Sequence, residues 1–119
     1  MTYIRPILLT LLLLGARPAL AQRVEVDLDC QPAKGLLTYD CTIRLRRAGQ
    51  PLTGAGVSIG ADMPSMPMAH NVKPVNAVPG EQPGEYRARL ELEMSGQWAV
   101  KLRLSGPVRD QIIVKRNFE

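Results

Sequence analysis

Apolar and polar side chains alternate along the chain from about residue 24 onward. The alternation has a period of two, as in a β-strand with one buried face, and no run there has the 3.6-residue period of a helix. Short segments rich in glycine and proline, which are typical of turns, separate the runs. The pattern predicts six or seven strands, at residues 24–30, 39–46, 55–61, 71–75, 86–94, 98–104 and 108–115.

Short strands at near-regular spacing predict an all-β domain, an immunoglobulin-like antiparallel β-sandwich. The runs 86–94 and 98–104 are joined by a Ser-Gly turn, so we expect a hairpin with Met94 and Trp98 on its apolar side. Trp98 is expected in the core as the large inward aromatic of a small sandwich. Tyr86, which follows a Pro-Gly turn, is expected to anchor a corner.

Residues 1–21 have the features of a cleavable signal peptide. Arg5 supplies positive charge, residues 7–14 are a short apolar run, and Ala-Leu-Ala at 19–21 fits a cleavage site. The run is shorter than the roughly 20 residues that a membrane-spanning helix needs. We therefore expect cleavage after Ala21 and a periplasmic domain, residues 22–119, with no membrane attachment. An uncleaved anchor is the alternative.

The charge balance does not favour a nucleic-acid partner. The chain has 15 basic and 11 acidic residues, a formal net charge of +4, which falls to +2 without Arg5 and Arg17 of the predicted signal peptide. No basic run extends beyond residues 44–47, and nucleic-acid binding is therefore not expected.

Cys30 and Cys41 are the two cysteines of the chain. In an oxidising compartment an even pair of cysteines is expected to form a disulfide. Their spacing fits a bridge across two neighbouring strands. A thiolate pair for metal or redox chemistry is the alternative, although the spacing is not that of a C-x-x-C motif.

The segment 62–70, Asp-Met-Pro-Ser-Met-Pro-Met-Ala-His, holds three of the five methionines and the only histidine. Thioether and imidazole groups are good ligands for soft ions such as Cu(I) or Ag(I). If the segment is extended, Met66, Met68 and His70 point to one side and form the expected Cu(I) site. Met63 is out of this register and Met94 depends on the hairpin, so both are secondary candidates.

Other ions and other roles were weighed against Cu(I). Asp62 is the only carboxylate in the segment, which disfavours Ca²⁺ and Mg²⁺. Zinc is disfavoured because the chain has one histidine and no thiolate is expected to be free. Methionine also fills irregular gaps in cores, so packing or contact with a partner protein is an alternative role for these side chains.

Three motifs in order resemble the YtkA-like domain family: the run at 62–70, Pro-Gly-Glu-Tyr at 83–86, and Met-Ser-Gly-Gln-Trp at 94–98. They are also similar to the periplasmic domain of FixH-type proteins, which accompany assembly of copper-containing terminal oxidases. The resemblance covers about residues 36–115. It implies an immunoglobulin-like sandwich, an envelope location and a role in copper handling.

No nucleophile motif, phosphate-binding loop or paired-carboxylate motif is present, so an enzyme is not expected. The sequence favours an exported copper-binding protein that holds Cu(I) for buffering or for delivery to an envelope partner. The alternatives are a metal-free immunoglobulin-like interaction module and an accessory to oxidase assembly or metal efflux.

Overall fold

The computed structural model describes residues 2–3 and 23–119, so the predicted signal peptide lies almost entirely outside the described residues. The described part is all-β, and it contains no helix long and apolar enough to cross a membrane. The strands are β1 (Val24–Pro32), β2 (Thr38–Arg47), β3 (Gln50–Pro51), β4 (Gly56–Asp62), β5 (Asn71–Asn76), β6 (Val78–Pro79), β7 (Glu85–Glu91), β8 (Gly96–Ser105) and β9 (Asp110–Phe118).

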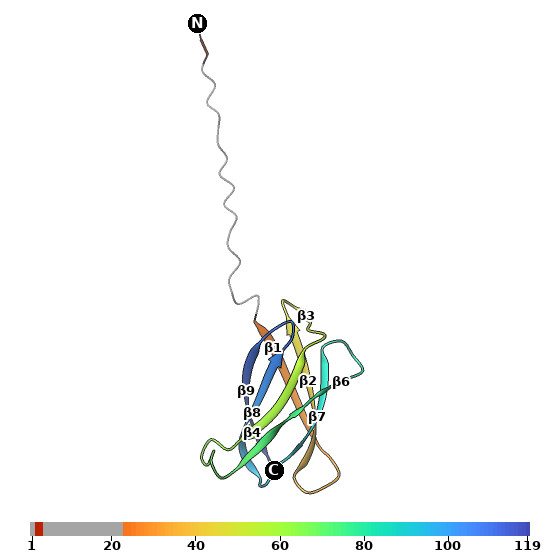
Figure 1. Cartoon of the computed structure of the whole chain (residues 1–119), viewed down its shortest axis with the longest axis vertical. Helices are drawn as coiled ribbons and strands as arrows, with labels where there is room; N and C mark the ends of the chain where they lie inside the picture. Colours follow the sequence, from red (N-terminus) through yellow and green to blue (C-terminus); the bar gives the residue numbers. More distant parts are fainter. Residues whose placement is uncertain (1, 4–22) are drawn as a thin grey trace.

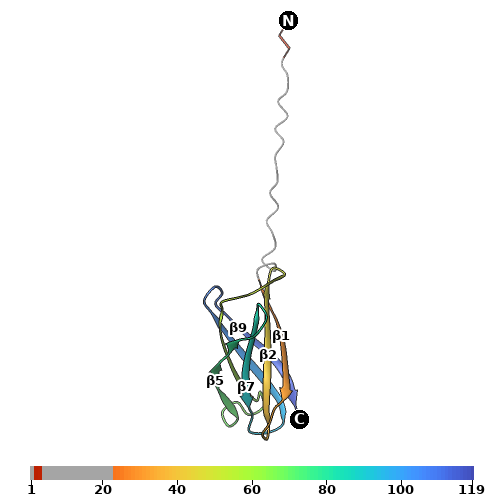
Figure 2. The ribbon, with the colours of Figure 1, turned by 90° about the vertical axis from the view of Figure 1, so that its right-hand side faces the viewer.

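Two antiparallel sheets face each other as a β-sandwich (Figures 1 and 2). The first sheet has the order β1-β2-β7-β6, with β3 beside β2, and the second has the order β5-β4-β8-β9. These orders match the ABED and CFG sheets of an immunoglobulin domain, with β5 added beside β4. The predicted sandwich is therefore confirmed. Its seven longer strands correspond to the predicted runs, and β3 and β6 are two-residue additions.

The core lies between the sheets, where the apolar positions of the alternating runs meet. Trp98 is fully buried, as predicted, and so are Ile43 on β2 and Leu90 on β7. Tyr86 anchors a corner as expected: its hydroxyl donates to the Leu52 carbonyl at 2.8 Å and accepts the Ala55 N–H at 3.1 Å. These two bonds hold the chain that leads from the first sheet into β4.

The predicted hairpin between residues 86–94 and 98–104 is wrong. β7 belongs to the first sheet and β8 to the second, so residues 92–95 cross from one sheet to the other. Leu92 is buried in this crossing and its N–H donates to the Leu37 carbonyl at 2.9 Å. Alternation shows which side of a strand is buried. Two strands in different sheets bury their apolar sides as well as two strands of one hairpin do, so alternation does not distinguish the two arrangements.

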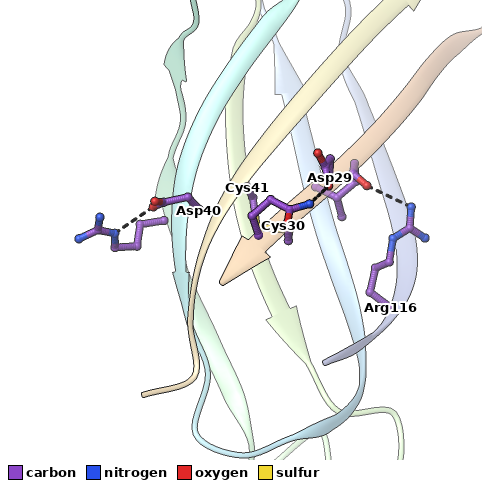
Figure 3. The surroundings of a disulfide bond; sticks show 8 residues. Asp29, Cys30, Asp40, Cys41 and Arg116 are labelled. Carbon is purple, nitrogen blue, oxygen red and sulfur yellow. Dashed lines mark hydrogen bonds and ion pairs between the residues drawn. A yellow bond between two sulfur atoms is a disulfide. The ribbon is translucent and has the colours of Figure 1, made fainter. Parts of the chain in front are cut away.

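Cys30 and Cys41 form the predicted disulfide. The two residues are directly opposite each other on β1 and β2, so the bond lies within one sheet and not between the two sheets (Figure 3). Arg116 on β9 donates to the Leu28 carbonyl at 3.2 Å. This bond ties the edge of the second sheet to the free edge of β1, so the disulfide and Arg116 together secure the first strand.

Candidate metal site at the methionine-rich loop

Residues 63–70, named the Met loop below, connect β4 to β5 at one end of the sandwich (Figure 1). The Met63 N–H donates to the His70 carbonyl at 3.1 Å and closes the base of the loop. The N–H groups of Met66 and His70 donate to the Met63 and Met66 carbonyls at 3.0 and 3.1 Å. Each of these bonds closes a turn, so the chain reverses direction within a few residues.

The prediction of an extended segment is therefore wrong. Residues 64–65 and 67–69 are turns, so strand alternation does not align Met66, Met68 and His70. The prolines explain the difference, because a fixed proline φ fits the second position of a turn as well as it fits a strand. Ligands that are close in a tight loop can still converge on one ion, but they do so through turn geometry.

The three methionines of the loop have different environments. Met63 is buried at 6% exposure, and its Cε methyl lies 3.0 Å from where a Cβ on Gly96 would be. Met66 is 42% exposed and Met68 is 93% exposed. Met63 therefore packs in the core beside the start of β8, whereas Met66 and Met68 are exposed to solvent.

His70 is held by Glu93, a residue that the sequence did not single out. The Nδ1 atom of His70 lies 2.9 Å from Oε2 of Glu93, and the His70 side chain is 28% exposed. With an ionised Glu93, a neutral imidazole carries its proton on Nδ1 and leaves the lone pair on Nε2. A carboxylate on one ring nitrogen is the usual support for a histidine that binds a metal through the other.

Glu93 could not be found from the sequence because it continues the polar side of an alternating run. Such residues are mostly solvated. The crossing between the sheets takes Glu93 off the strand and brings it to the Met loop.

Met94 follows Glu93 in the same crossing and is partly buried against the core. Its carbonyl accepts the Trp98 indole N–H at 3.1 Å, which fixes the backbone at this point. The Met loop contacts this part of the chain at two points. Met63 lies against Gly96 at the start of β8, and His70 contacts Glu93 in the crossing. Met94 lies in the segment that these contacts bring to the Met loop.

The donor set at this end suits a soft ion better than a hard one. Within residues 23–119, no three side chains from His, Cys, Asp and Glu gather as metal ligands, and both cysteines are in the disulfide. The soft potential ligands within residues 63–70 are the three thioethers and the His70 imidazole. Cu(I) is the common biological ion for which thioether and imidazole are suitable ligands.

Fold and loop together define a class of protein: a small, disulfide-bonded β-sandwich with methionine and histidine side chains on one end. The chain belongs to the YtkA-like family, whose model matches residues 19–103. This range includes the Met loop, Tyr86 and Trp98, so the family suggested by the three motifs is confirmed. Neither a curated protein nor a solved structure matches the chain significantly.

Proposed function

We propose that the protein is exported to the periplasm and binds Cu(I) at the Met loop through Met66, Met68 and Nε2 of His70. The observation that carries the proposal is the His70–Glu93 contact, in a tight loop that also carries the exposed residues Met66 and Met68. Thioethers carry no charge and do not form disulfides, so they remain available where free thiols do not. Exposed ligands in a surface loop also suit exchange with a second protein, which favours buffering or delivery.

A competition titration against a chromophoric Cu(I) chelator tests the proposal. The wild type is expected to remove one Cu(I) per chain from the chelator. The triple variant Met66→Leu, Met68→Leu, His70→Ala is expected to lose this capacity. The matched control Met63→Leu, Met94→Leu removes two thioethers from packed positions and is expected to bind as the wild type does. A triple variant that competes as well as the wild type would refute the Met loop as the site.

The exposed apolar side chains support a second candidate, a metal-free interaction module. Leu36 is 91% exposed in the loop between β1 and β2. This loop lies at the same end of the sandwich as the Met loop (Figure 1). Pull-down from envelope extract, with and without a copper chelator, separates the two functions. Capture that survives the chelator and is lost on replacement of the Met loop favours the module. Oxidase assembly and metal efflux are settings in which either function could operate.

A further inference from the structure

The outer face of the second sheet carries a groove that extends from the base of the Met loop, where Asp62 and Asn71 line it. The groove has a volume of about 290 Å³, and residues of β4, β5, β8 and β9 line it. We name it the outer groove. The residues that line it include Ser58, Gly60, Lys73, Pro74, Arg103 and Gln111. A Cβ on Gly60 would lie 3.3 Å from the Val72 carbonyl oxygen and 3.4 Å from Cγ of Pro74. Glycine here leaves the base of the groove open while β5 passes close by.

Hydrogen-bond donors are aligned across the groove by the strand register. Ser58 on β4 is opposite Arg103 on β8, and Arg103 is opposite Gln111 on β9. Residues that are directly opposite in an antiparallel sheet project from the same face. A hydroxyl, a guanidinium and an amide therefore project side by side, and Lys73 adds an ammonium group from β5.

The cations of the groove are not all neutralised. Lys101 at the groove forms an ion pair with Asp62. Lys73 and Arg103 take part in none of the ion pairs found within residues 23–119. A second hollow along β8 and β9 shares Arg103 and adds Arg109.

The first sheet has a different charge balance. Three of the five arginines on its strands are paired with a carboxylate: Arg44 with Asp27, Arg89 with Asp40, and Arg87 with Glu85. The strands of the first sheet carry six acidic and five basic residues in all, whereas the strands of the second sheet carry two acidic and five basic residues. The excess of positive charge therefore lies on the second sheet, and the outer groove is on that sheet.

We propose that the outer groove binds a small organic ligand through an oxyanion group, a carboxylate or a phosphate. The Arg103 guanidinium would donate to the oxyanion, and Ser58, Gln111 and Lys73 would supply further donors, which is the usual recognition of such groups. Val72 and Pro74 line the same groove and would contact the carbon skeleton. A volume of about 290 Å³ is near the lower end for small-molecule pockets, which favours a compact ligand.

Two-dimensional amide NMR on the copper-free protein tests the proposal. The protein is titrated with succinate, with inorganic phosphate and with sodium chloride at matched ionic strength. We expect saturable shifts at the amides of Ser58, Gly60 and Gln111 with at least one of the two oxyanions. Saturation with succinate identifies a carboxylate ligand, and saturation with phosphate alone identifies a phosphate ligand.

The variant Lys73→Gln, Arg103→Gln is expected to weaken this binding about tenfold or more, because charge-assisted hydrogen bonds are lost. The control Lys34→Gln, Arg46→Gln removes the same charge at exposed positions outside the groove and is expected to bind as the wild type does. Shifts that chloride reproduces, or equal weakening in both variants, would overturn the proposal. The test involves no copper, so it is independent of the function proposed for the Met loop.

Discussion

The contact between His70 and Glu93 fixes how the histidine of the Met loop is held. Nδ1 of the imidazole lies 2.9 Å from Oε2 of Glu93. An exposed hydrogen bond of this kind adds little to stability, about 1 kcal/mol or less. Its main effect is therefore on the tautomer and orientation of the ring, because a neutral imidazole that donates from Nδ1 keeps its lone pair on Nε2.

Replacement of Glu93 by alanine is expected to weaken Cu(I) binding about 10–100-fold, the usual effect of losing the carboxylate behind a metal-binding histidine. The measurement is chelator competition on the folded variant. Glu91→Ala is the control, since Glu91 is an exposed acid at the end of the same run and has no contact with His70. Equal affinities for the two variants would contradict the orienting role of Glu93.

Met63 and Met68 should respond oppositely to truncation because one is buried and the other is exposed. Met63→Ala is expected to lower the free energy of unfolding by about 2–5 kcal/mol, the usual cost of a cavity in a core. Met68→Ala is expected to change it by no more than about 0.5 kcal/mol. Urea denaturation of both variants gives the comparison. A larger loss for Met68 than for Met63 would mean that the loop packs differently.

At the scale of the elements, the disulfide links the first two strands at the edge of the sandwich. Among the described strands, β1 pairs with β2 alone, and Cys30 and Cys41 close a short hairpin between them. A cross-link of this kind restricts the unfolded chain and so favours the folded state.

The double variant Cys30→Ser, Cys41→Ser is expected to lose about 2–4 kcal/mol of unfolding free energy. Wild-type protein unfolded in urea with a thiol reductant should show the same loss, because the bond is then absent from both states. Unchanged stability in the double variant would show that β1 is held by its other contacts, including Arg116.

Strand positions and the core could be predicted from the sequence, because alternation directly reports which side chains are buried. Ile43 and Trp98 are examples. The assignment of β7 and β8 to different sheets could not be predicted, since both crossings and hairpins fit a Ser-Gly turn. For the same reason the contact of Glu93 with His70 could not be predicted, because the position of Glu93 depends on that crossing. In the Met loop the residue types are the basis of the copper hypothesis, but the turns that position them depend on backbone hydrogen bonds that no spacing rule specifies.

At the scale of the whole molecule, the two candidate binding sites lie in different places, one at an end of the sandwich and one on a face of a sheet. The Met loop, the crossing of residues 92–95 and the loop between β1 and β2 lie at one end (Figure 1), while the outer groove lies on the face of the second sheet. The two sites meet at Asp62 and Asn71, which line the groove and flank the Met loop. Anion binding is measured on the copper-free protein, so the two tests remain separate.

The copper proposal depends on the predicted export of the chain. Expression of the full chain in a bacterium, followed by fractionation and N-terminal sequencing, is expected to give a periplasmic protein that begins at Gln22. The variant Ala19→Arg, Ala21→Arg should remain unprocessed, because large charged residues block an A-x-A cleavage site. A full-length protein in the cytoplasm would contradict export and remove the reason for preferring thioethers to thiols.

The most direct test of the central claim is the X-ray absorption spectrum at the copper edge of the protein loaded with one Cu(I). We expect sulfur scatterers from Met66 and Met68 together with one imidazole nitrogen, and we expect the nitrogen contribution to disappear in His70→Ala. A spectrum with only oxygen or nitrogen neighbours, or one that His70→Ala leaves unchanged, would contradict a site built from the Met loop and His70.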